Sequence, residues 1–410
     1  MEDIPADAQI FRGALTLSNL QASLLHCVKL GGRKHESCFI FVIMRFQVCF
    51  WLGLMATFAS SHAGPGPIPS KYYDLSRYTR FSDSTEKKIA SFFQYYHKTG
   101  IFNGTYLFFR NDSLIQGAHG YANFGKPDTL INDDLFQLAS VSKTITGISI
   151  MMLQQDGLLL IDDSVHWYIP ELTRRNLTIR NLLCHMSGLP DYFYFSSYLW
   201  PNQSAHMKNS DVVIQLNQQP ERNFGEPGTY HSYSNTNYAL LAHIVERLTG
   251  MDFRTYTRKN IFEPCGMKYT HICNHDSIPL FNYPVQGYDK RRVFSDIPHN
   301  GTTGDKGVYS NGVEMFFLDR ALRNNYLLNN SSKALMWTPQ VQVSADGAGY
   351  ALGWRVKVIN GQKWVFHNGW WKGFRTYFWR CLDEDKCFVV LTNNVYGPFL
   401  RTVDMVGLLN

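Results

Sequence analysis

The sequence lacks the dense positive charge of a nucleic-acid-binding protein. Only 18% of its 410 residues are charged, and the net charge of +6 is spread along the chain without a basic stripe. We also find no low-complexity tract and no internal repeat, so a solenoid or propeller architecture is not expected. With 45% hydrophobic and 15% aromatic residues, the chain can instead form a large core, in one domain or two lobes.

Cysteine is scarce, with eight in the chain and three of these within the first 49 residues. In an oxidising compartment, the best disulfide pair among the other five is Cys381 with Cys387, which flank a polar turn between two apolar strands. Cys265 with Cys273 is another candidate pair. We expect Cys184 to be a buried free thiol.

An unbroken apolar run of membrane-spanning length is missing as well. Residues 39–44 and 46–59 are apolar, but Arg45 lies between them and would cost roughly 2.5–3.5 kcal/mol near the centre of a bilayer. Read from Met44, residues 44–63 have the basic start, apolar middle and small-residue end of a signal peptide. Residues 1–43 would then be an upstream extension of the gene model, and the protein would be periplasmic or secreted. The alternative is a membrane anchor over residues 38–59, and only then would a membrane be a partner.

After a Gly/Pro linker over 64–79, we expect one domain over 80–410. Strand patterns occur near both of its ends, first as a hairpin within 105–121 and later in three segments between 363 and 393. From about 158 to 300 the pattern is helical and rich in loops. This order predicts an α/β (α+β) fold, in which helices flank an antiparallel β-sheet built from both ends of the domain and a mostly helical lobe is inserted. A cleft is expected between the two.

One stretch offers a nucleophile. Ser140 and Lys143 lie three positions apart where an extended apolar segment turns into a helix, so their side chains share a helical face. The Asp156-Gly157 pair is a stop signal for this helix. A serine hydroxyl is a weak nucleophile that needs a neighbour to take its proton, and a buried lysine can do so. The helix N-terminus also directs backbone N–H groups toward the group that the serine attacks.

Two more motifs accompany this pair. Tyr233-Ser234-Asn235 precedes a predicted helix, and His367-Asn368-Gly369 ends a predicted strand. Each motif is weak evidence by itself, because the same residue types recur at the same spacing elsewhere. These copies are Ser84–Lys87, Tyr121–Asn123, Tyr309–Asn311, His62–Gly64 and His299–Gly301. Taken together, in this order and context, the three motifs resemble those of the serine β-lactamase and penicillin-binding-protein superfamily, especially its class C-like branch of β-lactamase-related hydrolases. The resemblance covers roughly residues 80–400.

The resemblance implies a role for each residue. Ser140 would be the acylated nucleophile, and Lys143 its base or the group that holds its base. Tyr233 would relay protons to the serine and to the leaving group. Asn235 would hydrogen-bond Lys143 and the substrate amide.

The third motif implies the remaining contacts. His367 stands where the lactamases have a lysine, and would polarise the tyrosine or bind substrate. Gly369 allows the backbone to approach closely. The backbone N–H groups of Ser140 and Trp370 would form an oxyanion hole, each donor being worth roughly 3–4 kcal/mol.

The function implied is hydrolysis of an ester or amide through an acyl-enzyme, without metal or cofactor. Candidate substrates are a small ester, a D-amino-acid peptide, a peptidoglycan-derived peptide or a β-lactam-like compound. Efficient β-lactamase activity is not expected, because there is no lysine-threonine-glycine and Glu171 has the context of a structural residue. The alternatives are a penicillin-binding protein with D-alanyl carboxypeptidase or endopeptidase activity, and a slowly turning over sensor that stays acylated.

Some side chains are open to two interpretations. Arg375 either pairs with a substrate carboxylate or is structural. Three possible metal ligands, His271, Cys273 and His275, lie close together, but no fourth is evident and we expect no metal site. The aromatic residues that either line an apolar pocket or only pack are Tyr192, Tyr194, Tyr198, Trp200, Trp370 and Trp371.

Overall fold

The computed structural model describes residues 68–69, 73–126, 128–219, 225–273 and 285–410. The chain separates into two units, Met1–Ala63 and Gly64–Asn410, and all described residues belong to the second. The predicted upstream extension, signal peptide and alternative anchor therefore lie outside the described residues. Among the residues described, no helix is both long enough and apolar enough to cross a membrane.

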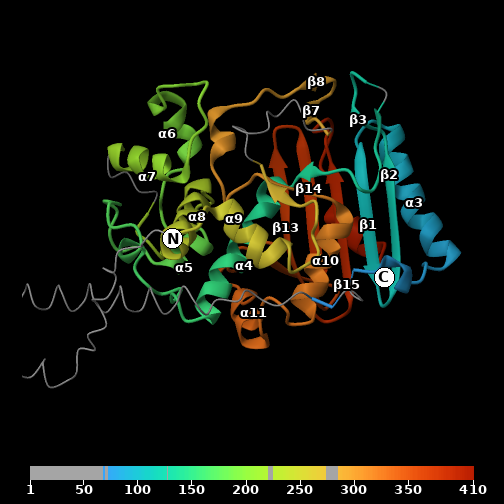
Figure 1. Ribbon diagram of the computed structural model, residues 1–410. Coiled ribbons are helices and arrows are strands. Elements are labelled where there is room, and N and C mark those ends of the chain that lie inside the picture. Colours follow the sequence, from blue (N-terminus) through green and yellow to red (C-terminus); the bar gives the residue numbers. More distant parts are fainter. Residues whose placement is uncertain (1–67, 70–72, 127, 220–224, 274–284) are drawn as a thin grey trace, which may run out of the picture. The chain divides into compact units, whose positions relative to one another are not determined.

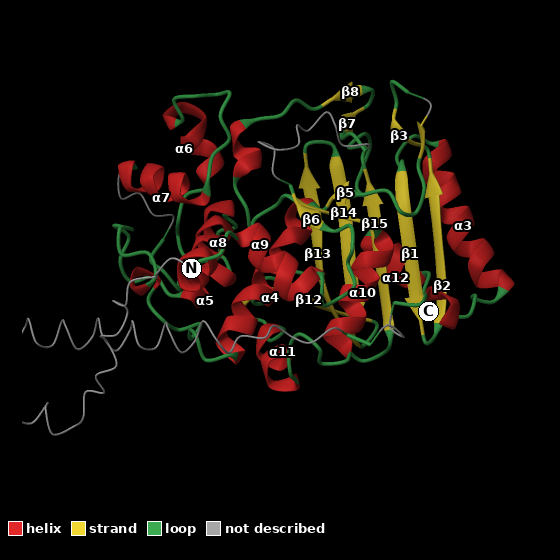
Figure 2. Cartoon of the chain, in the orientation of Figure 1, coloured by secondary structure: helices red, strands yellow, loops and turns green. Residues whose placement is uncertain are grey.

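An eight-stranded antiparallel sheet forms the centre of this unit (Figures 1 and 2). In spatial order its strands are β10 (Val341–Gln342), β11 (Gly349–Tyr350), β12 (Arg355–Ile359), β13 (Gln362–Trp371), β14 (Phe374–Cys381), β15 (Lys386–Thr392), β1 (Gly104–Arg110) and β2 (Ser113–His119). The N-terminal hairpin β1–β2 joins the C-terminal strands through the β1–β15 pair. The predicted fold class, with one sheet built from both ends of the domain, is confirmed.

Both faces of this sheet are covered, because both alternating sets of side chains along its central strands are apolar. In β1, Leu107 and Phe109 join a core shared with the helical part of the chain. Tyr106 and Phe108 point to the other face and join a second core, which includes Phe93 of the N-terminal helix. Such two-sided burial accounts for strands that read as continuous apolar runs.

Helices pack on both sides of the sheet, and Figure 1 shows α3 beside β2 and a group of helices, α5 to α8, at the opposite end. The α-helices are α3 (Asp83–Lys98), α4 (Ser142–Gln155), α5 (Ile179–Leu183), α6 (Tyr192–Leu199), α7 (Asn209–Gln218), α8 (Asn235–Thr249), α9 (Phe253–Thr257), α10 (Gly312–Arg323), α11 (Asn330–Met336) and α12 (Thr402–Gly407). Short 3-10 turns are η2 (Leu75–Arg77), η3 (Ala139–Val141), η4 (Val165–Trp167) and η7 (Pro298–Gly301), and η5 (Arg258–Phe262) is a π-turn. Among the described residues there are also three small sheets. They pair β5 (Phe136–Gln137) and β6 (His271–Ile272) with β9 (Val308–Ser310), β3 (Tyr121–Asn123) with β4 (Asp128–Thr129), and β7 (Tyr288–Asp289) with β8 (Arg292–Val293).

The predicted disulfide between Cys381 and Cys387 is wrong, and so is the candidate pair Cys265 and Cys273. All of these cysteines are buried free thiols, as is Cys184, for which that prediction is confirmed. In the β14–β15 ladder, Cys387 lies opposite Arg380, so these two side chains share a face of the sheet. Cys381 is one position further along and points to the other face, where it joins the second core. Sequence proximity across a turn does not reveal this difference.

Candidate active site

Ser140 lies in the single turn η3, between strand β5 and helix α4. The structure thus places it where a strand becomes a helix, as the sequence predicts. Ala139 has a φ of 50°, in the left-handed region that side chains other than glycine rarely adopt, so the chain turns sharply just before the serine. The turn is anchored on one side by pairing of Phe136 with Ser310, and on the other by the buried helix α4.

Gly369 of strand β13 packs directly on this turn. A Cβ atom at position 369 would lie 2.4 Å from the carbonyl oxygen of Leu138 and 2.2 Å from Oγ1 of Thr376. The same Thr376 hydroxyl donates a 2.6 Å hydrogen bond to the Leu138 carbonyl. The glycine of the third motif therefore lets β13 approach the serine turn as closely as it does.

Lys143 lies beneath Ser140 and is completely buried. Its ammonium donates hydrogen bonds to Ser140 Oγ at 3.2 Å, to Asn235 Oδ1 at 2.7 Å and to the backbone carbonyl of Asp305 at 2.8 Å. It also lies 5.1 Å from the centre of the Tyr233 ring. One lysine thus connects the first motif to both residues predicted from the second motif.

Helix α8 begins at Asn235, with Ser234 as its N-cap, so the helix predicted to follow the second motif begins at the last residue of that motif. This places Asn235 in the first helical turn, where Asp191 accepts hydrogen bonds from both its backbone N–H and its side-chain amide at 2.8 Å. Because the amide nitrogen faces Asp191, the amide oxygen must face Lys143. Asp191 also caps helix α6 through the N–H of Phe193, and burial raises its carboxyl pKa. Sequence reasoning missed Asp191, and its only signal was its position after the Gly188-Leu189-Pro190 loop.

His367 lies on β13 in the wall of the site, but it is almost completely buried. Its Nε2 atom lies 3.0 Å from the Tyr350 hydroxyl, and its Nδ1 atom lies 2.7 Å from the carbonyl oxygen of Asn368. Burial, with the nearby Arg355 and Lys143 cations, holds its pKa well below the usual range. Its ring centre is 6.4 Å from that of Tyr233. The histidine is thus brought to the site, with both ring nitrogens engaged by the protein.

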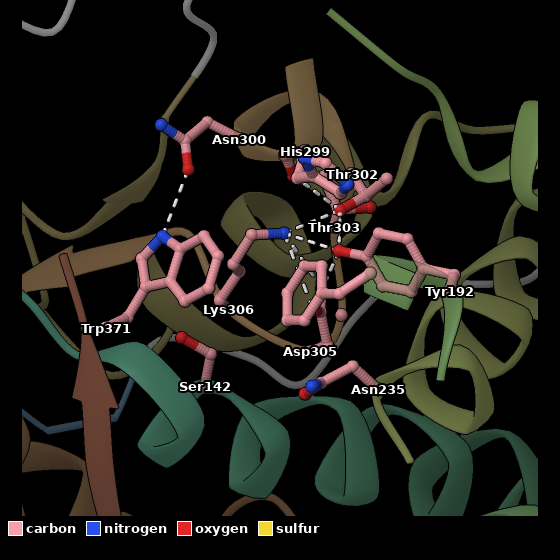
Figure 3. A network of polar contacts seen from close by, with 12 residues as sticks. Ser142, Tyr192, Asn235, His299, Asn300, Thr302, Thr303, Asp305, Lys306 and Trp371 are labelled. Carbon is pink, nitrogen blue, oxygen red and sulfur yellow. Dashed lines mark hydrogen bonds and ion pairs between the residues drawn. The ribbon is translucent and has the colours of Figure 1, made fainter. Parts of the chain in front are cut away.

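A second buried lysine, Lys306, forms another part of the wall (Figure 3). Its ammonium donates to the Tyr192 hydroxyl at 2.8 Å and to Thr302 Oγ1 at 2.6 Å, and both Asp305 carboxylate oxygens lie 3.4 Å away. Its neighbours include the ring faces of Tyr192, Phe193 and Trp371. Burial lowers the pKa of Lys306 to about 8. The lysine holds the side chain of Asp305, whose carbonyl binds Lys143.

These residues surround a cavity of about 780 Å³. Of the predicted site residues, it is lined by Ser140, Tyr233, Asn235, His367, Gly369 and Trp370. Lys143, the remaining one, lies beneath its floor and bonds Ser140. Residues that sequence reasoning missed complete the lining, chiefly the polar Asp191, Asp305, Lys306 and Arg355 and the aromatic Phe193, Phe294, Phe366 and Phe399.

The structure also shows which of the aromatic residues open to two interpretations line the cavity and which do not. Tyr194, Trp370 and Trp371 line the cavity. Tyr192 is buried behind the wall, whereas Tyr198 bonds Gln219 on the surface and the Trp200 ring nitrogen bonds the carbonyl of Ala205.

Arg375 is structural, because its guanidinium donates to the backbone carbonyls of Val395, Gly397 and Pro398. Of the motif copies, Ser84 lies exposed on α3 and Tyr309 is buried in β9. His299, in η7, bonds Ser196 rather than the serine turn. Among the motif copies in the described part of the chain, only Ser140–Lys143, Tyr233–Asn235 and His367–Gly369 meet at the cavity.

Within the described part of the chain, no group of three His, Cys, Asp or Glu side chains is arranged to hold a metal ion. His275, from the possible ligand group, lies outside the described residues.

Comparison with known proteins identifies the family. The family model described as Beta-lactamase matches residues 89–407. The chain belongs to the beta-lactamase family of serine hydrolases. The predicted relationship, fold and enzyme class are thereby confirmed.

Similar proteins include penicillin-binding proteins and D-aminopeptidases. A penicillin-binding protein of Bacillus subtilis (strain 168) is 30% identical over 71% of this chain and 68% of its own length. A D-aminopeptidase of Brucella anthropi is 23% identical over 68% of this chain, but the match spans only 54% of that enzyme.

Two solved structures share the fold. A penicillin-binding protein from Bacillus halodurans has a TM-score of 0.65 and 25% identity, covering 74% of this chain and 95% of its own. A D-amino acid amidase from Ochrobactrum anthropi SV3, complexed with L-phenylalanine amide, has a TM-score of 0.67 and 20% identity, covering 80% of this chain and 97% of its own.

Proposed function

We propose that this protein is an exported serine hydrolase that cleaves an ester or amide through an acyl-enzyme on Ser140. The observation that carries the proposal is the contact of Ser140 Oγ with the buried Lys143 ammonium at the floor of the cavity. Once deprotonated, Lys143 takes the serine proton as the hydroxyl attacks the substrate carbonyl. Tyr233, on the same wall, passes a proton to the leaving group. Water then attacks the acyl-enzyme, helped by the same two side chains.

Three further contacts support this chemistry. Asn235, held by Asp191, keeps Lys143 in place and has one amide proton left for a substrate carbonyl. The backbone N–H groups of Ser140 and Trp370 are the donors proposed for the oxyanion. His367 acts on the wall as a neutral group, because burial disfavours its charged form.

The aromatic side chains of the cavity wall suit a substrate with an apolar or aromatic side chain. Phe193 and Trp371 stack with ring centres 4.8 Å apart, and Trp370 meets Phe399 edge to face at the rim, where Trp370 is 64% exposed. Candidate substrates are a small ester, a D-amino-acid amide or peptide, and a β-lactam-like compound. The D-aminopeptidase and amidase relatives agree with the second of these.

One observation favours the alternative of a carboxypeptidase acting on D-alanyl peptides, including peptidoglycan-derived ones. Arg355 lines the cavity and stacks on Tyr350, and among the described residues its guanidinium has no hydrogen bond or ion pair. Strand β12 begins at this residue, opposite Phe366, so residues 367–371 of β13 have no strand partner on that side within the described part of the chain. An arginine at the end of an open strand edge suits the carboxylate of a peptide lying along it.

Labelling followed by turnover tests the main proposal. A fluorophosphonate should label the wild-type protein and not Ser140→Ala, and mass spectrometry should find the adduct on the peptide that contains Ser140. Turnover is then compared on p-nitrophenyl esters, D-alanyl peptides and nitrocefin. A label that persists for hours without product would favour the acylated sensor. Equal labelling of Ser140→Ala would show that another residue is the nucleophile.

A matched substrate pair tests the carboxypeptidase alternative. Wild type should cleave an acyl-D-alanyl-D-alanine faster than the same peptide with a C-terminal amide. Arg355→Met should raise KM about 10-fold for the free acid alone, since a charge-assisted hydrogen bond to the carboxylate is lost. A similar loss on both substrates would assign Arg355 a structural role instead.

Export is a separate part of the proposal. We expect the protein recovered from outside the cytoplasm to begin at Gly64, after cleavage of residues 44–63. N-terminal sequencing of the secreted product measures this. Recovery of the protein only in membranes, with residues 38–59 intact, would instead support the anchor.

A further inference from the structure

A line of hydrogen bonds connects three buried side chains behind the cavity wall. The Tyr350 hydroxyl lies 3.2 Å from His185 Nε2 and 3.0 Å from His367 Nε2. These residues come from three separate segments, the loop after α5, strand β11 and strand β13. All three are at most 2% exposed, so water does not compete for these contacts.

At the His185 end of this line, two N–H donors of the protein fix which ring nitrogen carries the proton. The backbone N–H of Ser234 and the side-chain amide of Asn237 both point at His185 Nδ1, at 3.2 Å. The Asn237 orientation is independently set, because its Oδ1 atom accepts from the Ser187 hydroxyl. Since Nδ1 accepts, a neutral His185 carries its proton on Nε2, the atom facing Tyr350.

At the His367 end of the line, a backbone carbonyl fixes which ring nitrogen carries the proton. The carbonyl oxygen of Asn368 can only accept, so His367 Nδ1, at 2.7 Å, must carry a proton. A neutral His367 therefore has a bare Nε2 atom. The Tyr350 hydroxyl has one proton, and this is the only arrangement that satisfies both neighbours.

We propose that Tyr350 and His185 are positioning residues of this active site. Tyr350 accepts a hydrogen bond from His185 and donates one to His367, and so holds His367 as a neutral acceptor rather than a cation. His185 in turn packs against Tyr233, with ring centres 4.1 Å apart. A tyrosine on β11, outside all three motifs, thereby connects the second motif to the third.

Every charged or titratable neighbour of this line agrees with neutral imidazoles. The neighbours are Lys143, Arg355, His231, Tyr233, Tyr238 and Cys184, and burial raises the thiol pKa of Cys184 to about 11. None of them is a carboxylate that would stabilise an imidazolium, and the Tyr238 hydroxyl donates to the Leu183 carbonyl. Burial and the nearby cations lower the pKa of both histidines.

The first test reads the proton positions directly and does not depend on the proposed reaction. The full-length protein is labelled with ¹⁵N-histidine, and the ring nitrogen signals of His185 and His367 are assigned from the variants H185Q and H367Q. Between pH 6 and 8 we expect His185 protonated on Nε2 and His367 on Nδ1, with neither titrating. A charged ring, or the opposite proton position on either ring, would overturn the proposal.

The second test removes only the hydroxyl, with Tyr350→Phe, and rests on hydrolysis through Ser140. His367 then loses its donor, so its pKa should rise and the acid limb of kcat/KM should move up by about one pH unit. On the acid limb itself, below the wild-type midpoint, we expect a loss in kcat/KM of up to about 10-fold, and a much smaller loss at pH 8. The control Tyr256→Phe removes another buried tyrosine hydroxyl, on α9, and should leave the profile unchanged.

The two tests fail in different ways. An unchanged pH profile and an unchanged His367 titration in Tyr350→Phe would show that the tyrosine only packs. If no substrate is turned over, the proposed reaction fails, while the ring nitrogen signals still decide the positioning role.

Discussion

The acceptors around Lys143 decide what this side chain can do. Its ammonium is buried among three oxygen atoms, one from each of Ser140, Asn235 and Asp305. The lysine at the same spacing in the motif copy, Lys87, lies exposed on helix α3. The same pair of residue types therefore forms a buried, hydrogen-bonded arrangement at the cavity in one place and an ordinary helix surface in the other.

We expect Lys143→Ala and Tyr233→Phe each to lower kcat/KM by about 10²–10⁴, because each removes a proton-transfer group. Lys87→Ala is the matched control and should leave turnover unchanged. Activity and thermal melting are measured on the same samples. A melting transition that collapses in both active-site variants would point to structural roles instead.

Because of Lys306, the free energy of unfolding should change with pH in the alkaline range. Its pKa is about 8 in the folded protein, compared with 10.5 ordinarily. Between these values the unfolded chain holds a proton that the folded protein has released, so the unfolding free energy rises with pH, by at most about 1.4 kcal/mol per pH unit. Below pH 8 the lysine is protonated in both states, so its contribution does not change with pH.

Urea unfolding at pH 8 and pH 9.5 measures the effect. Lys306→Met should show a smaller rise than wild type, because the methionine has no proton to release. Equal slopes in the two proteins would mean that Lys306 has an ordinary pKa.

At the scale of elements, the approach of strand β13 to the turn η3 forms the site. Gly369 permits this approach, and Thr376 of β14 bonds the same turn through the Leu138 carbonyl. The serine turn is thus held from the sheet side, while α8 and the Asp305 loop hold Lys143 from the helical side. The cavity lies where these elements meet.

We expect Gly369→Ala to destabilise the protein by about 1–3 kcal/mol and to lower activity at least 10-fold, because its Cβ would force β13 away from the serine turn. Gly407→Ala is the control, since no atom lies within 4 Å of its added Cβ on helix α12. Thermal melting and fluorophosphonate labelling rates are compared. A variant as active as wild type would show that β13 can shift without disturbing Ser140.

At the scale of the whole molecule, several buried histidines make the fold sensitive to acid. Burial lowers the pKa of His299 to about 4, and that of His185 and His367 well below the usual range. As the pH falls below about 6.5, the unfolded chain binds protons that the folded protein does not. The unfolding free energy therefore falls with pH in this range, and the loss from each histidine ends at its folded pKa.

Between pH 6.5 and 4.5, His299→Asn should lose stability less steeply than wild type, by roughly 1 kcal/mol per pH unit at most. Chemical unfolding at several pH values measures this difference. His206→Asn serves as a surface control, because His206 pairs with Asp296 at the protein surface. Parallel curves for wild type and His299→Asn would show that His299 titrates normally.

Local patterns in the sequence were enough to predict the fold class and the positions of the motif residues. The apolar runs of β1 and β14, the helical period after Ser140 and the stop at Gly157 are all properties of neighbouring residues, and such patterns follow from backbone geometry. The family resemblance showed that three motifs far apart in the chain belong to one site pattern. The local patterns and the family resemblance both point to Ser140 as the candidate nucleophile.

Only the tertiary structure decided which side chains meet. It brought Asp191 to Asn235, Tyr350 between two histidines, and Arg355 rather than Arg375 to the cavity. It also separated Cys381 from Cys387 on opposite faces of one sheet. These outcomes depend on strand register and on loop packing between residues far apart in the chain, and no local period in a sequence records them.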